Sequence, residues 1–516
     1  MSARPIRLFR SFVTVGGWTL GSRVLGFLRD AAIAAVLGAG AAAEAFVIAF
    51  ALPNMFRRFF AEGAFNTAFV PMFAKRVGSE DGGRAFAEEA LAGLATILLL
   101  LTLLAEALMP WLVWAMAGGF GADPAKFDLT VAMGRVMFPY ILFISLAALF
   151  SGALNALGRF AAAAAAPVLL NVILIAALAA AVPLGAPERW LTWAVLVAGL
   201  AQLALVRFAA RRAGLLLALR PPRLTPALRR LARVAVPAAL AGGVVQVNLL
   251  VGRQVASFFD GAVAWLYYAD RLYQLPLGVV GVAIGIVLLP ELARRLAAGD
   301  AAASRAAFNR ATEFSLALTL PAALALVVIA SPVTSVLFER GAFGPEDSRA
   351  TALAVAVYGA GLPAFVLQKV VSPLFFAREN TRTPFHYALV SMVVNAAIAI
   401  GLAPFLGFLA AALGTTLAGW VNLALLWQGA RRFGDAARPD AALLRRLPRL
   451  AIATVLMGLV LAMAAELLAP QLGTPGLRYA ALALLVGIGL AAYAAVSFAT
   501  GALTRAELRA AARRGR

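Results

Sequence analysis

The stretch EALAGLATILLLLTLLAEALMPWLVWAMA, residues 89–117, contains two charged side chains, Glu89 and Glu106. A helix needs about 20 mainly apolar residues to cross the hydrocarbon core of a membrane. Hydropathy predicts fourteen such spans, at about residues 11–37, 42–74, 89–117, 129–153, 160–183, 190–209, 231–259, 262–292, 309–338, 349–376, 384–405, 407–430, 447–469 and 477–500. The sequence therefore predicts an all-α polytopic membrane protein.

The composition supports this class. Of 516 residues, 63% are hydrophobic and 13% are charged, against about 45–50% and about 25% in soluble domains. A chain this apolar cannot bury its side chains in a water-soluble fold, which excludes a soluble enzyme and a disordered regulator. With no cysteine and one histidine, His386, thiolate metal sites and histidine clusters are also excluded. We expect no cofactor.

The basic residues predict the orientation of the chain. Of 45 lysines and arginines, 32 lie at or beside the N-terminus, the even-numbered connections and the C-terminal tail, whereas five lie in the odd-numbered connections. Basic residues collect on the cytoplasmic side of a membrane, so both termini are predicted to be cytoplasmic. This placement accounts for most of the net charge of +21. The basic run 207–233 is interpreted as facing anionic lipid, and nucleic acid is not expected as a partner.

The chain repeats itself at an offset of about 224 residues. Arg29 corresponds in this way to Arg253, and Asn171 corresponds to Asn395. Six spans per repeat make the two halves parallel, as in transporters that rock two lobes around a central site. We predict an N-terminal lobe at 1–219, a C-terminal lobe at 220–432, and two extra helices with a cytoplasmic tail at 433–516.

Several charged residues lie within the predicted spans, where an arginine or aspartate at mid-membrane costs about 2.5–3.5 kcal/mol. Such residues usually face a cavity and have a function. The arginines are Arg23, Arg29, Arg57 and Arg271, and the acids are Asp30, Glu44 and Asp270. The alternative is a set of structural ion pairs, in which Asp30 and Asp270 each pair with an arginine on another helix. The excess of arginine favours a cationic cavity.

Arginine presents forked donors that match phosphate and carboxylate. A cationic site between two lobes therefore indicates an anionic substrate. The extra pair of apolar helices indicates that this substrate also has a lipid part. An amphiphile with a phosphorylated head group satisfies both conditions.

Three motifs carry a resemblance to a known family. They are SRVLGFLRD at 22–30, LPNMFRRFFAEGAF at 52–65 and YYADRL at 267–272. They resemble the MurJ (MviN) family of lipid II flippases, within the multidrug/oligosaccharidyl-lipid/polysaccharide exporter superfamily. The resemblance extends over the whole chain.

The resemblance implies alternating access around a central arginine-lined cavity. Lipid II, the undecaprenyl-diphosphate-linked peptidoglycan precursor, would cross from the cytoplasmic to the periplasmic leaflet of the bacterial inner membrane. The implied substrate-binding residues are Arg23, Arg29, Arg57, Arg271 and Asn54, and the implied charge-pairing or coupling residues are Asp30, Glu44 and Asp270. The implied partners are lipid II and membrane lipids, with cell-wall synthesis or division proteins as candidates.

The sequence departs from the family pattern at three positions. Glu44 replaces an aspartate common in relatives, which preserves the charge. Ala51 and Gln274 stand where some relatives have lysine and glutamate, so two opposite charges are lost together.

Two other functions stay open. One is export of a different polyprenyl-linked oligosaccharide or of a drug. The other is a membrane-embedded transferase acting on a polyprenyl phosphate. Such an enzyme needs clustered carboxylates for a metal or a general base, and the sequence has neither an Asp-x-Asp motif nor a Walker motif.

Overall fold

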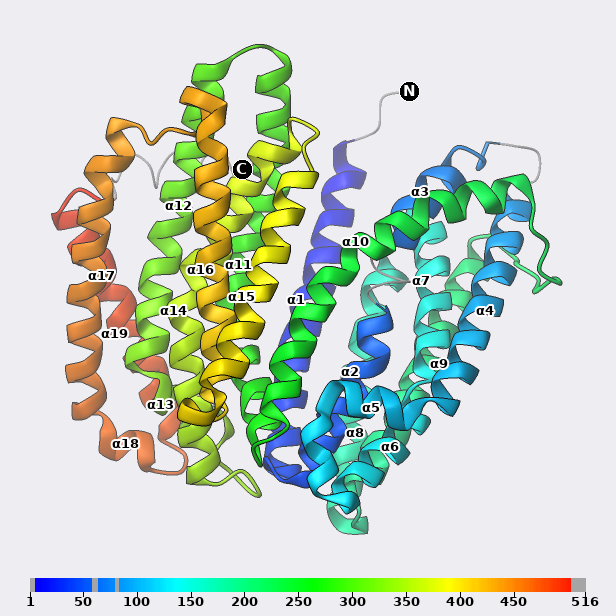
Figure 1. Cartoon of the computed structure of the whole chain (residues 1–516), viewed down its shortest axis with the longest axis horizontal. Helices are drawn as coiled ribbons and strands as arrows, with labels where there is room; N and C mark the ends of the chain where they lie inside the picture. Colours follow the sequence, from blue (N-terminus) through cyan, green and yellow to red (C-terminus); the bar gives the residue numbers. More distant parts are fainter. Residues whose placement is uncertain (1–4, 58–63, 79–82, 503–516) are drawn as a thin grey trace. The chain divides into compact units, whose positions relative to one another are not determined.

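The computed structural model describes residues 5–57, 64–78 and 83–502. It confirms the predicted all-helical fold class (Figure 1). Ten helical stretches within these ranges are long and apolar enough to cross a membrane, by length and composition. The count of fourteen spans and the cytoplasmic termini stay predictions.

The chain divides into two compact units. The first comprises Met1–Ala264 with Arg340–Phe343, and the second comprises Trp265–Glu339 with Gly344–Arg516. Helices of the first unit are α1 (Pro5–Leu37), α2 (Ala41–Arg57), α3 (Ala64–Ala74), α4 (Arg84–Ala107), α5 (Met109–Ala117), α6 (Pro124–Met137), α7 (Tyr140–Ala156), α8 (Ala161–Leu184), α9 (Pro187–Arg212) and α10 (Pro226–Ala256), with a short 3-10 helix at Gly118–Ala122.

The second unit takes up the chain within α11 (Ala262–Ala297). Its other helices are α12 (Ala301–Val328), α13 (Ala330–Phe338), α14 (Pro345–Phe376), α15 (Arg382–Leu406), α16 (Leu409–Ala430), α17 (Ala441–Leu467), α18 (Ala469–Gly473) and α19 (Arg478–Ala499), with a 3-10 segment at Arg431–Ala437. Helix α10 packs against α3, α4 and α5, which places it in the first unit. The three-segment division stays a prediction.

Proline explains where one predicted span divides and where another ends. The span at 89–117 is two helices, α4 and α5, separated at Leu108 just before Pro110. The helix of the span at 447–469 ends in the same way at Leu468, and Pro470 lies in the first turn of α18. Proline has no backbone N–H and its ring clashes with the preceding turn, whereas the first turn of a new helix tolerates it. Each of these two prolines therefore lies in the first turn of a new helix instead of interrupting one.

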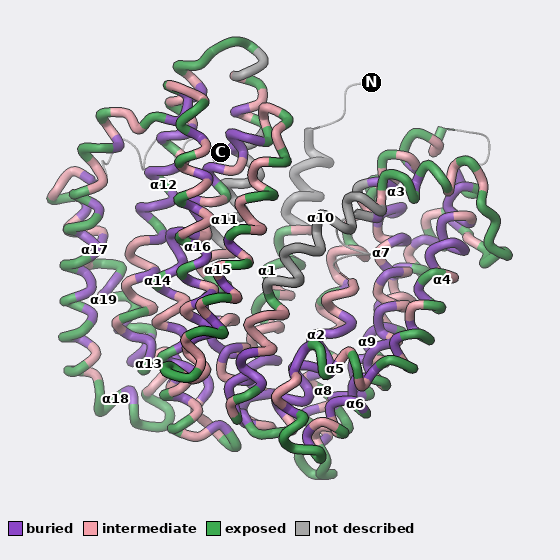
Figure 2. The backbone as a smooth tube through the Cα atoms, in the orientation of Figure 1, coloured by how far each residue is buried: buried purple, intermediate pink, exposed green. Residues whose placement is uncertain are grey.

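Burial along α17 shows how the helices face their surroundings. Leu450, Met457 and Leu461 are buried, while Leu459 and Met463 on the opposite side are 58% and 67% exposed. Figure 2 shows exposed and buried positions alternating along this helix. Exposed apolar surface on this scale marks a membrane or interaction surface, so the outer side of α17 faces lipid.

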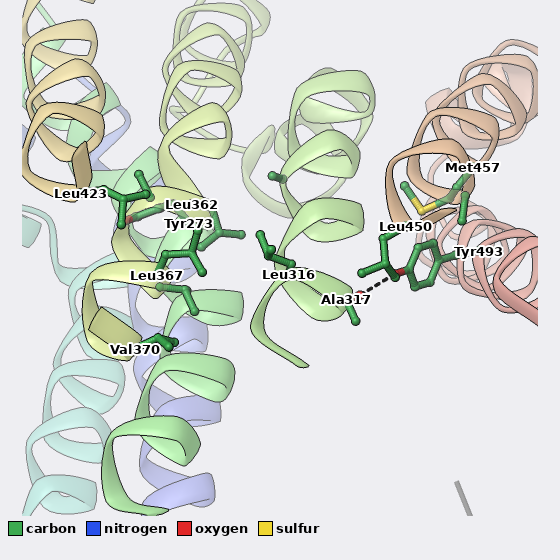
Figure 3. Close-up of a cluster of buried hydrophobic side chains, with 14 of the residues drawn as sticks. Tyr273, Leu316, Ala317, Leu362, Leu367, Val370, Leu423, Leu450, Met457 and Tyr493 are labelled. Atoms are coloured by element: carbon green, nitrogen blue, oxygen red, sulfur yellow. Dashed lines mark hydrogen bonds between the residues drawn. The ribbon is translucent and has the colours of Figure 1, made fainter. Parts of the chain in front are cut away.

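The core of the second unit holds α17 and α19 against α12. Leu316, Leu450 and Met457 belong to one buried cluster (Figure 3). The hydroxyl of Tyr493 on α19 donates a hydrogen bond of 2.7 Å to the Ala317 carbonyl on α12. Arg446 on α17 pairs with Glu313 on α12. The last two long helices are therefore packed onto the unit by apolar and polar contacts.

A tight turn at Arg340–Phe343 packs on the end of α1 within the first unit. The Ala342 amide donates a 2.8 Å hydrogen bond to the Ala35 carbonyl. Gly38 and Gly341 have φ angles of +63° and +58°, and a Cβ on Gly341 would overlap the Ala35 carbonyl oxygen. Only glycine fits this close approach.

We expect Gly341→Ala to destabilise the fold by more than about 2 kcal/mol, because a left-handed residue strained by about 1–3 kcal/mol also meets the Ala35 carbonyl. Thermal unfolding in detergent measures the effect. Gly476→Ala is the matched control, since Gly476 has a φ of +89° and open space around its Cβ position. Equal destabilisation by both variants would show that the contact with α1 contributes nothing.

Candidate functional site

Arg29 and Asp30 lie buried near the end of α1, 8% and 2% exposed. The Arg29 guanidinium donates from Nε and Nη2 to Asp30 Oδ1 at 2.9 and 2.7 Å, and from Nη1 to Asn171 Oδ1 at 2.9 Å. Asn171, on α8, donates in turn to the Ser22 carbonyl at 3.0 Å. Arg29 and Asp30, both named as site residues from the sequence, thus form a charge-assisted cluster that joins α1 to α8.

Arg23 has different surroundings, although it is on the same helix. Its side chain is exposed and lines a pocket of about 330 Å³. The pocket is formed by α1, the end of α7 and the first turns of α8, with Ser22, Asn155 and Phe160 also in its wall. This volume lies in the range of small-molecule sites.

Glu44, in the first turn of α2, is 1% exposed and forms an ion pair with Lys126 of α6. Its Oε1 also accepts a 3.0 Å hydrogen bond from the Val263 amide. Lys126 Nζ lies 3.5 Å from Asp260 and 4.2 Å from the centre of the Phe120 ring. A buried carboxylate is thus neutralised by Lys126, which is one of the five basic residues that the sequence analysis counted in the odd-numbered connections.

The same end of the first unit holds the turn between α10 and α11. The amides of Gly118 and Gly119 donate to Gln254 Oε1 at 2.9 Å and to Ser257 Oγ at 3.0 Å. Together with the Glu44–Val263 contact, these bonds fix the end of α10 to the segments around Glu44.

Asn54 and Arg57 lie in the last turns of α2, both partly buried. Asn54 Nδ2 donates 2.7 Å to the Phe50 carbonyl one turn earlier. The ring of Phe50 is 6.0 Å from the Arg29 guanidinium carbon, so α2 lies beside the Arg29 cluster. Arg58, singled out in the motif, lies outside the described residues.

Asp270 and Arg271 lie on α11 in the second unit. The Arg271 guanidinium carbon is 4.5 Å from the centre of the Tyr267 ring, and Gln274 hydrogen-bonds Asp270. Gln274 donates to the neighbouring acid, which a glutamate at this position would repel.

Sequence reasoning missed Lys126 and Asn171 as partners of the predicted acids and arginines. Lys126 had a signal: it is one of three lysines in the chain and one of few basic residues in the odd-numbered connections. For Asn171, the only sequence signal was its correspondence to Asn395 in the internal repeat. Neither residue is near its partner in sequence.

Solved structures with a similar fold are membrane transporters. A structure titled "Lipid II flippase MurJ, inward closed conformation" matches with a TM-score of 0.77 at 23% identity, covering 94% of this chain and 98% of that one. An inward-facing multidrug resistance MATE family transporter of the MOP superfamily matches with a TM-score of 0.68 at 15% identity, over 80% and 95%. The fold is that of this class of polytopic transporters.

Sequence comparison identifies the family. Residues 33–479 match the family described as Lipid II flippase MurJ. A probable lipid II flippase MurJ of Rhizobium meliloti is 49% identical over 98% of this chain and 97% of its own length. The lipid II flippase MurJ of Burkholderia cenocepacia is 37% identical over 83% and 85%. The chain belongs to the MurJ family.

Proposed function

We propose that this protein is a flippase that moves lipid II across a bacterial membrane. The observation that carries the proposal is the full-length match to relatives named as lipid II flippases. The transporter fold and the burial of Arg29 in α1 support it. The membrane is the inner membrane, and transport runs from the cytoplasmic to the periplasmic leaflet by alternating access of the two lobes.

In this proposal Arg23, Arg29, Arg57 and Arg271 bind the diphosphate head group, together with Asn54. The first three arginines belong to the first unit and Arg271 to the second. Arginine supplies parallel donors that suit the oxygens of a diphosphate.

The acids Asp30, Glu44 and Asp270 are proposed to balance or couple this charge. Asp30 holds the Arg29 guanidinium through two hydrogen bonds, which fixes the direction of its remaining donors. Glu44 is paired with Lys126, so its proposed role is charge pairing at the opposite end of α2 from Arg57.

Depleting the protein in its host tests this function. Lipid II is expected to accumulate in the cytoplasmic leaflet, where an added periplasmic enzyme or label does not reach it. A plasmid copy of the chain should restore exposure of lipid II. Unchanged lipid II levels and sidedness after full depletion would contradict the proposal.

The membrane potential is expected to drive transport. The substrate head is anionic and the cytoplasm is negative, so moving one negative charge outward across 100 mV releases about 2.3 kcal/mol. Collapsing the potential with valinomycin and potassium should slow outward flipping while the pH gradient stays intact. Unchanged flipping, at equal expression, would favour an ion-coupled step at Asp30, Glu44 or Asp270 instead.

Two alternatives give different results in the same assays. An exporter of another polyprenyl-linked oligosaccharide would leave lipid II sidedness unchanged and trap its own substrate. A polyprenyl-phosphate transferase would change the mass of a labelled lipid, whereas a flippase changes only its leaflet.

A further inference from the structure

The pocket beside Arg23 combines donors and apolar wall within one unit. From α1 it takes Thr19, Ser22 and Arg23, which share one side of the helix at spacings of three and four residues. From the end of α7 it takes Asn155, and from the start of α8 it takes Phe160 and Pro167. Among the residues that the structure describes, no aspartate or glutamate lines it, so this wall carries no negative charge opposite Arg23.

Arg23 differs from Arg29 in how its donors are used. Three donors of Arg29 are engaged by Asp30 and Asn171. Arg23 makes no hydrogen bond or ion pair with any residue in the described ranges. Its five N–H donors are therefore available to a ligand in this pocket.

The other polar groups of the pocket add donors. Asn155 is exposed, and it lines the pocket with Ser22 and Arg23. An amide and a hydroxyl each supply hydrogen-bond donors. The first turn of α8 forms part of the pocket wall. The N-cap residue of α8 is Phe160, whose side chain has no acceptor for the first backbone amides of the helix. Free amides and the helix dipole favour an anion at this end, which adds to the charge of Arg23.

We propose that this pocket is a subsite for a prenyl-linked diphosphate, with Asn155 and Ser22 as ligands beside Arg23. The proposal rests on the proposed function and assigns part of its substrate to one lobe. The donors take phosphoryl oxygens, while Phe160 and Pro167 contact the carbon chain next to the phosphate. Free phosphate offers no group for the apolar wall, so the amphiphile is the better ligand.

Binding of geranyl diphosphate to the full-length protein tests the subsite, in nanodiscs of zwitterionic lipid. Asn155→Leu removes a donor at similar volume and should weaken binding about five- to tenfold. Asn155→Asp adds a like charge and should weaken it about a hundredfold. Leu219→Asp adds the same charge on the 72% exposed Leu219, outside the pocket, and should change affinity less than twofold. Inorganic pyrophosphate should bind at least tenfold more weakly than geranyl diphosphate.

Several results would overturn the subsite. They are wild-type affinity in both Asn155 variants, equal affinity for inorganic pyrophosphate, and loss of geranyl diphosphate binding when phosphatidylglycerol replaces the zwitterionic lipid. The last result would assign the pocket to a phospholipid head group. Melting temperatures in detergent verify that each variant is folded.

Lipid II translocation by the unmodified protein separates this inference from the proposed function. If the unmodified protein translocates lipid II and the Asn155 variants bind geranyl diphosphate with unchanged affinity, the subsite is rejected and the proposed function is retained. If the Asn155 variants bind geranyl diphosphate more weakly but the unmodified protein does not translocate lipid II, the proposed function is rejected and the prenyl diphosphate site is retained.

Discussion

Arg29→Ala is expected to abolish lipid II transport and to lower stability. The substitution removes charge-assisted contacts, each worth about 1.5–3 kcal/mol, so transport should fall about ten- to a hundredfold per lost contact. It also leaves Asp30, 2% exposed, without the arginine that accounts for its two described side-chain hydrogen bonds. Complementation of a depleted strain measures transport, and protein level in the membrane measures folding.

A double variant separates the two effects. Arg29→Ala/Asp30→Ala removes the buried carboxylate together with its partner, so membrane levels should recover while transport stays lost. Asn171→Ala serves as a milder control, because it removes only one of the three described bonds of Arg29. Growth restored by the double variant would mean that Arg29 serves the fold alone.

Lys126→Met is expected to destabilise the first unit by about 3–5 kcal/mol. Breaking a buried ion pair leaves an uncompensated charge, and Glu44 and Lys126 are 1% and 5% exposed. Denaturation of the purified protein in detergent measures the loss. Glu44→Gln/Lys126→Met should recover most of it, because the glutamine oxygen still accepts from the Val263 amide.

An exposed ion pair provides the matched control. Arg294 pairs with Glu291 on α11, and the Arg294 side chain is 76% exposed. Arg294→Met should cost less than about 1 kcal/mol. If Lys126→Met costs no more than this variant, the Glu44 pair does not stabilise the fold.

Hydropathy predicted the helices because each membrane span must satisfy its own backbone hydrogen bonds and present apolar side chains to lipid. The breaks at Leu108 and Leu468 also had a local signal, since Pro110 and Pro470 follow them closely. Hydropathy alone joined α4 and α5 into the single span at 89–117, because it records apolar character and not direction.

The contacts that build the site had no such local signal. Glu44 and Lys126 are 82 residues apart, and the Arg340–Phe343 turn reaches Ala35 across about 300 residues. Such pairs depend on how helices pack, which a single sequence does not record. The in-span arginines could be predicted because burying charge in a membrane is costly enough to make each one informative, but Arg23 and Arg29 look alike in sequence and differ only in their neighbours.

Translocation of labelled lipid II in proteoliposomes tests the central claim most directly. The label is placed in the inner leaflet, and an impermeant reagent reads its arrival in the outer leaflet. The protein should expose the label at least tenfold faster than protein-free vesicles, and the Arg29→Ala/Asp30→Ala variant should match the vesicles without protein. Equal rates for the unmodified protein and for protein-free vesicles, with the protein folded and inserted, would contradict the claim that this chain moves lipid II.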